Sequence, residues 1–60
     1  MELTSLLTSM HEVLLSTNND LEKFNNGNKS AGTRIRKAMQ EVKSLAQAVR
    51  VEVQDIKNDM

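Results

Sequence analysis

Five basic residues recur at intervals of seven in the second half of the 60-residue chain, and they are the side chains best placed to do chemistry. They are Lys29, Arg36, Lys43, Arg50 and Lys57. On an α-helix this spacing stacks them along one line, about 10 Å apart, where they can contact successive phosphates of a polyanion. The alternative is the basic rim of a coiled coil, paired with acids on the facing helix. Acidic residues of the first half do not recur at a matching spacing, which favours phosphate binding.

A second basic cluster lies between Gly27 and Lys37. It places basic side chains and free backbone N–H groups at the start of a predicted helix, where the helix dipole favours an anion. Gly32 lies in the first turn of this helix, where Gly lowers helix stability by about 1 kcal/mol relative to Ala. Its presence there therefore calls for an explanation. Close approach of a phosphate and close approach of the Phe24 ring both remain open. The candidate DNA-binding residues are Lys29, Thr33, Arg34, Arg36, Lys37, Lys43 and Arg50.

Residues suited to catalysis or metal binding are scarce. The chain has no Cys, and its single His11 lies next to Glu12 with no third ligand at metal spacing. Adjacent residues do not share a face of a helix, so His11 is predicted to be a solvated surface residue. The Ser and Thr residues of the first half lack a base at a partner spacing. We therefore expect that the protein is not an enzyme and that it binds no metal, no cofactor and no small-molecule substrate.

The net charge is zero, but the charges are unevenly distributed. Residues 1–26 carry four acidic residues against one basic, residues 27–50 six basic against one acidic, and residues 51–60 three acidic against one basic. This asymmetry points to a polyanionic partner. The chain also shows no basic n-region and no long apolar run, so neither a secretory signal nor a membrane span is expected. The expected location is the cytoplasm.

The first half shows the alternating four-and-three spacing of a coiled-coil seam. Its members are Leu3, Leu7, Met10, Leu14, Thr17, Leu21 and Phe24, with Leu6 and Val13 beside them. Residues 16–20 prefer caps and turns to helix interiors. Because the seam resumes in phase at Leu21, we predict one helix over residues 2–26. The alternative is a break near Asn18.

Asn25-Asn26-Gly27-Asn28 is the strongest turn signal in the chain. Gly27 can supply the left-handed residue that ends one helix, and Asn28 can cap the next. We therefore predict a turn at residues 26–28 and a second helix over residues 29–58. The predicted fold is all-α, a single domain over residues 1–60 built as an antiparallel helical hairpin.

The predicted second helix is apolar over a wider arc than one neighbouring helix can cover. Its seam runs through Ala31, Ile35, Ala38, Val42, Leu45, Val49 and Ile56, and a second row holds Met39, Ala46, Val53 and Met60. A chain this short buries only about 60% of its unfolded surface, so a monomer should be marginally stable without a disulfide, a metal or a partner subunit. We therefore expect a homo-oligomer, at its simplest a twofold dimer forming a four-helix bundle. The predicted oligomer interface is Leu7, Leu14, Met39, Val42, Leu45, Ala46, Val49 and Val53.

Asp20-Leu21, Lys23 and the run from Gly27 to Lys37 resemble the chlamydial-type bacterial histone-like proteins, a small helical family similar in composition to eukaryotic linker histones. The resemblance covers most of the chain. It implies a nucleoid-associated protein that binds and compacts DNA with little sequence preference, with Lys29, Arg34, Arg36 and Lys37 as backbone contacts. The chain differs from the chlamydial members in being neutral and in lacking their long tail rich in Lys, Ala and Pro.

The expected function is therefore binding of double-stranded DNA through phosphates, with low sequence specificity, in the nucleoid. A dimer could bridge two duplexes or follow one bent duplex, and both remain open. The alternative function is a homo-oligomeric coiled-coil module with a protein partner. RNA binding is a weaker third possibility, because phosphate contacts alone do not distinguish the two nucleic acids.

Overall fold

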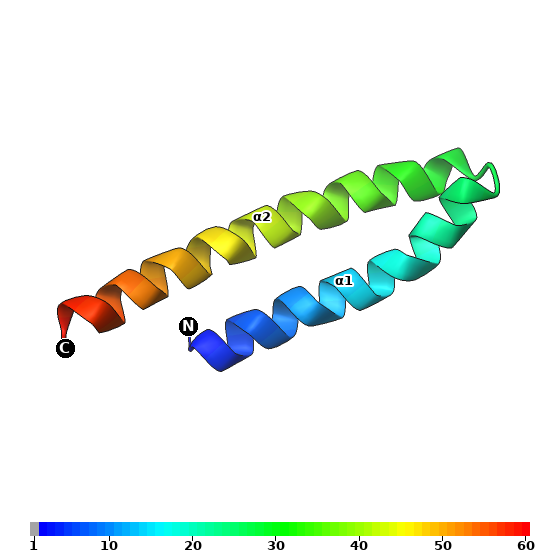
Figure 1. Ribbon diagram of the computed structural model, residues 1–60. Helices are drawn as coiled ribbons and strands as arrows, with labels where there is room; N and C mark the ends of the chain where they lie inside the picture. Colours follow the sequence, from blue (N-terminus) through cyan, green and yellow to red (C-terminus); the bar gives the residue numbers. More distant parts are fainter. Residues whose placement is uncertain (1) are drawn as a thin grey trace.

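Two antiparallel helices lie side by side and form a hairpin (Figure 1). The computed structural model describes residues 2–60, with α1 at Leu3–Asn25 and α2 at Lys29–Asn58. The molecule measures 50 × 15 × 13 Å, and the C-terminal end of α2 extends beyond the start of α1 (Figure 1). The predicted all-α antiparallel hairpin is confirmed.

Helix α1 is continuous through its polar middle stretch. The Ser16 hydroxyl donates to the Val13 carbonyl at 2.9 Å, and the Thr17 hydroxyl donates to the same oxygen at 2.7 Å. Because both hydroxyls bond to the backbone of the preceding turn, they do not divert the chain from its helical path. The alternative of a break near Asn18 is wrong.

The turn between the helices provides hydrogen bonds to backbone groups at both helix ends. Gly27 has a φ of +97°, its N–H donates to the Phe24 carbonyl, and the Asn28 N–H donates to the Lys23 carbonyl. This pair of hydrogen bonds is the Schellman motif that commonly ends a helix. The Asn28 side chain then accepts a hydrogen bond from the Ala31 N–H at 3.2 Å and caps α2. Both roles predicted for this turn are confirmed.

The face that α1 turns towards α2 differs from the predicted seam. Leu6, expected beside the seam, is only 1% exposed, and Val13 is partly buried. Leu7 and Leu14, expected within the seam, are about half exposed. The buried row therefore follows Leu6 rather than Leu7, because a single neighbouring helix covers only a narrow arc of α1 and the Leu7 side falls outside it.

On α2 the predicted seam agrees with the observed burial as far as Val49, whereas its last member, Ile56, is 39% exposed because the C-terminal end of α2 extends beyond the start of α1 (Figure 1). Ala31 is completely buried, and the seam continues through partly buried residues. They are Ile35, Ala38, Val42, Leu45, Val49 and, as a polar member, Glu52. Ala31 lies in the first turn of α2, so the buried seam begins directly after the turn between the helices.

Gly32 lies directly beside the Phe24 ring. A Cβ atom built at this glycine would stand 2.7 Å from Cε1 and 2.9 Å from Cδ1 of Phe24. Any side chain at position 32 would therefore displace the ring. Of the two reasons that the sequence left open for this glycine, the structure supports the close approach of the aromatic ring.

We expect Gly27→Val to lower the free energy of unfolding by about 1 kcal/mol or more, because a branched residue resists the left-handed conformation. No atom lies within 4 Å of a Cβ at this position, so the cost comes from the backbone alone. Urea unfolding followed by circular dichroism measures it. Gly27→Asn is the matched control, since Asn tolerates this conformation and should cost less. Equal stability of the Val variant and the parent would contradict the turn geometry.

We expect the effect of Gly32→Ala to depend on residue 24. In a Phe24→Ala background the substitution should stabilise the helix by up to about 1 kcal/mol, the usual gain of Ala over Gly. In the parent protein the displaced ring should remove that gain. A double-mutant cycle from urea unfolding at one protein concentration measures the coupling, expected to be about 0.5 kcal/mol or more. Additive effects would show that the ring does not constrain this glycine.

Candidate nucleic-acid interface

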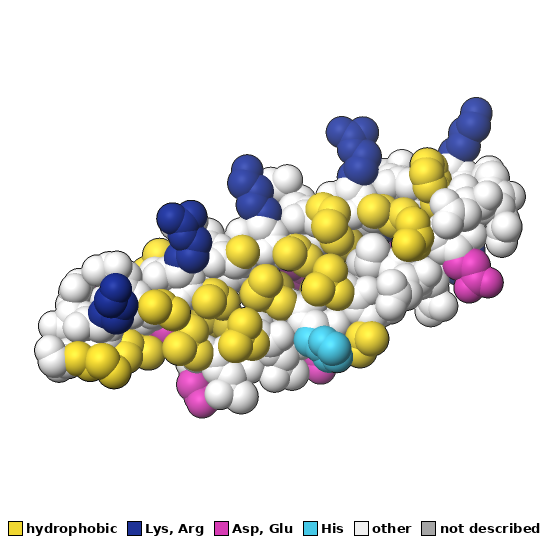
Figure 2. All heavy atoms as spheres, viewed as in Figure 1, with side chains coloured by type: hydrophobic (Ala, Val, Ile, Leu, Met, Phe, Trp, Pro, Cys, Tyr) yellow, Lys and Arg dark blue, Asp and Glu magenta, His cyan; other side chains and the backbone are white. Residues whose placement is uncertain are grey.

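The heptad-spaced basic residues form one exposed row along α2. We call Lys29, Arg36, Lys43, Arg50 and Lys57 the basic row; all of them are exposed. Figure 2 shows Lys and Arg side chains standing in a line along the edge of α2, beside a strip of hydrophobic side chains. Within residues 2–60, none of the basic row forms an ion pair. Their charges are therefore available to an external anion.

Arg34 and Lys37 do not join this row. One residue advances about 100° around a helix, so Arg34 lies about 200° from Arg36, and Lys37 lies about 100° from it. Arg34 instead reaches across the hairpin, where its Nε atom donates to the Asp20 carboxylate at 2.8 Å. The structure therefore divides the predicted DNA-binding residues between two flanks of α2.

Acidic residues of α2 share the flank of Arg34 and Lys37. By the same helical geometry, Glu41 and Asp55 project to this side and away from the basic row, as does the C-cap residue Asp59, while Glu52 lies at the adjoining edge of the seam. Each flank of α2 thus has its own character, one of mixed charge and the other purely basic. A chain of zero net charge consequently presents a local cationic surface.

A row of uncharged polar side chains accompanies the basic row and was missed by the sequence analysis, apart from Thr33. Its members are Thr33, Gln40, Gln47 and Gln54, all exposed and again seven residues apart. Each follows a basic residue by four positions and is therefore its neighbour on the helix surface. Hydroxyl and amide groups also hydrogen-bond to phosphates and sugars. The repeated pairing of a basic residue with a polar residue four positions later was the signal available in the sequence.

The strip of hydrophobic side chains beside the basic row draws on both helices (Figure 2). Leu7 and Leu14 of α1, and Met39 and Val53 of α2, are 40% to 53% exposed. We call these four residues, with Ala46, the apolar face. The other predicted interface residues, Val42, Leu45 and Val49, are partly buried and belong to the seam within the hairpin.

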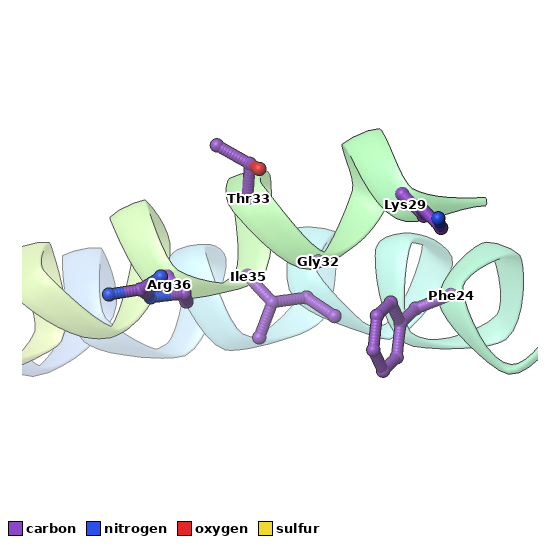
Figure 3. Close-up of a pocket in the computed structure, with 6 residues that line it drawn as sticks. All are labelled: Phe24, Lys29, Gly32, Thr33, Ile35 and Arg36. Atoms are coloured by element: carbon purple, nitrogen blue, oxygen red, sulfur yellow. The ribbon is translucent and has the colours of Figure 1, made fainter. Parts of the chain in front are cut away.

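An open hollow of about 380 Å³ lies at the turn end of the molecule. It is lined by Phe24, Lys29, Gly32, Thr33, Ile35 and Arg36. Figure 3 shows Phe24 and Ile35 on the same side of α2, with Gly32 between them. Phe24 is the only Phe, Tyr or Trp residue of the chain, and it is 49% exposed. The hollow therefore combines an accessible aromatic ring with two members of the basic row.

Comparison with protein families identifies the chain through almost its whole length. Residues 4–59 match the family described as histone H1-like protein Hc1. The chain belongs to this family. No curated protein and no solved structure gives a significant match. The histone-like resemblance predicted from the sequence is thus confirmed.

Membership in the Hc1 family makes this chain a histone-like, DNA-binding protein of the nucleoid. The family consists of DNA-packaging proteins and is not a known enzyme family. In residues 2–60 no group of three or more His, Cys, Asp or Glu side chains could hold a metal ion. Neither helix of this part of the chain has the combination of length and hydropathy that crossing a membrane requires.

Proposed function

We propose that this Hc1-family protein binds double-stranded DNA with low sequence specificity, through contacts between the basic row and phosphates. The observation that carries this proposal is that the row is exposed and free of ion pairs among residues 2–60. A coiled-coil rim would pair these charges across the hairpin. Here the single ion pair of the described residues involves Arg34, which lies outside the row.

The length of the basic row suits a duplex. From Lys29 to Lys57 the row extends about 42 Å at 1.5 Å per residue, slightly more than one turn of B-DNA at about 34 to 36 Å. A duplex lying along α2 would therefore meet positive charge over a full helical turn. Each phosphate neutralised by Lys or Arg releases counterions, which supplies affinity at low salt.

Low sequence specificity follows from the residue types. Phosphate contacts fix the position of a protein on DNA but carry no direct information about base sequence. The amides of Gln40, Gln47 and Gln54 add hydrogen-bonding groups beside the basic row and can bond to the same phosphates and sugars. Binding should accordingly be similar on any duplex.

We further propose that the apolar face mediates self-association into a twofold dimer, a four-helix bundle. The long side of the molecule measures 50 × 15 Å, comparable to the roughly 800 Å² per partner of a stable interface. The apolar face runs along part of this side, and large contiguous apolar patches are uncommon on soluble monomers. A dimer carries two basic rows, and one particle can then contact two duplexes and bring them together.

We expect the triple substitution of Arg36, Lys43 and Arg50 by Gln to weaken duplex binding equally for all DNA sequences. The slope of log affinity against log salt should fall in magnitude by about 0.9 for each lost phosphate contact, up to three per protomer. Fluorescence anisotropy at several salt concentrations measures both quantities, and circular dichroism checks that the hairpin persists.

The matched control for this triple variant is the double substitution of Arg34 and Lys37 by Gln. It removes basic residues from the same helix but from the other flank, so the slope should change less per charge removed. Unchanged affinity and slope in the triple variant would contradict the basic row as the DNA-binding surface. If neither variant changes the affinity for DNA, and the substitutions lower only the oligomeric mass, the result would instead support a coiled-coil module.

We expect light scattering to give at least twice the 6.7 kDa mass of one chain. Replacing Met39 and Val53 by Glu should return the mass towards that of one chain, because it places charges in the apolar face. Val51→Glu is the matched control. Val51 is also an exposed apolar residue of α2, but the basic row separates it from the apolar face. A well-folded monomeric parent at micromolar concentration would contradict the four-helix bundle.

A further inference from the structure

We infer that the hollow at the turn end binds an unstacked nucleobase, which stacks on Phe24 while Lys29 and Arg36 hold the flanking phosphates. This inference rests on the proposed DNA-binding function and adds a second kind of contact to it. The basic row alone recognises only the charge of a duplex. The hollow offers the chain's single Phe, Tyr or Trp side chain, at one end of that row.

The Phe24 ring is held in place and yet accessible. Its Cδ1–Cε1 edge lies against the backbone of Gly32, where a Cβ would stand 2.7 Å away. The residue as a whole remains 49% exposed, although a ring of this size is usually buried in a core. A ring held by its edge leaves aromatic surface for a flat partner, and every nucleobase has such a π-face.

The charges around the hollow favour a base within a nucleic-acid strand. Lys29 precedes Gly32 by three residues and Arg36 follows it by four, so the two basic side chains flank the hollow along α2. Neither forms an ion pair within residues 2–60. A base that stacks on the ring carries a phosphate on each side of its sugar, and this arrangement matches one aromatic group between two cations.

Unpaired bases reach such a site more easily than paired ones. Drawing a base out of an intact duplex costs the free energy of its pairing and stacking, and the cost is least where the base is already unpaired. The hollow should therefore prefer DNA that contains a bulged base, a kinked step or a single-stranded segment. Ile35, on the same side of α2 as the ring, adds an apolar contact for the extruded base (Figure 3).

The test compares three labelled DNAs long enough to span the 50 Å molecule. They are a fully paired duplex, the same duplex with one extra unpaired thymine at its centre, and a single strand. Fluorescence anisotropy should show binding to the bulged duplex at least about fivefold tighter than to the paired one, the lower limit for one base–aromatic stack. This ratio should vary little with salt, whereas each affinity falls with salt. If the protein binds the single strand as tightly as the bulged duplex, the ligand of the hollow is any unpaired base. If it binds the bulged duplex more tightly, the ligand is a base extruded from a duplex.

A preference for the bulged duplex could arise from stacking on Phe24 or from the greater flexibility of bulged DNA. Variants of residue 24 distinguish these two causes. Phe24→Leu keeps an apolar side chain beside Gly32 and should bring the bulged-to-paired ratio close to one, whereas Phe24→Tyr should retain the preference. Leu15→Ala is the matched control, because Leu15 is an exposed apolar residue of α1, as Phe24 is, but does not line the hollow. Circular dichroism verifies the fold of each variant.

Three results would overturn the inference. The parent protein could bind bulged and paired duplexes equally, or Phe24→Leu could keep the preference. Phe24→Leu could also halve the mass in light scattering without changing the ratio, which would assign the hollow to contacts between copies of this chain. Affinity for the paired duplex and its salt slope report on the basic row separately, so failure of the base site is distinguishable from failure of DNA binding.

Discussion

Two helices joined by a short turn can bury only one narrow row of side chains each, and this constraint organises the whole molecule. Leu6 and Ala31 are the fully buried residues among those described, and the rest of the seam is only partly covered. Every other row must face outwards. On α2 these outer rows are sorted by type, because residues seven apart return to nearly the same side of a helix. The apolar face, the basic row and the polar row beside it are the result.

The sorting of charge explains how a chain with zero net charge belongs to a DNA-binding family. Acidic residues of α2 share the flank of Arg34, and the basic row occupies the other. A helix is about 10 to 12 Å across, comparable to the Debye length of about 8 to 10 Å at physiological salt. The acids are therefore largely screened from a polyanion on the basic side. Net charge is a poor guide to partners when the charges lie on opposite flanks of one helix.

The turn connects the stability of the hairpin with its surface. Gly27 allows the chain to reverse, and Asn28 starts α2 at once, so Phe24 is brought against Gly32 within a few residues. The absence of a side chain at Gly32 admits the ring edge and leaves the hollow beside Lys29 and Arg36. The same residues that close the hairpin thus shape the surface at the end of the basic row.

Local features of this protein were determined by the sequence alone. The turn at Gly27, the cap at Asn28 and the alignment of the basic row depend only on neighbouring residues and the helical repeat, so they could be predicted. Tertiary structure decided that Leu6 rather than Leu7 faces α2, that Arg34 pairs with Asp20, and that Gly32 receives the Phe24 ring. Each of these depends on the rotation of one helix against the other. An amphipathic pattern cannot specify that rotation to within one residue, because the apolar arc of both helices is wider than the contact between them.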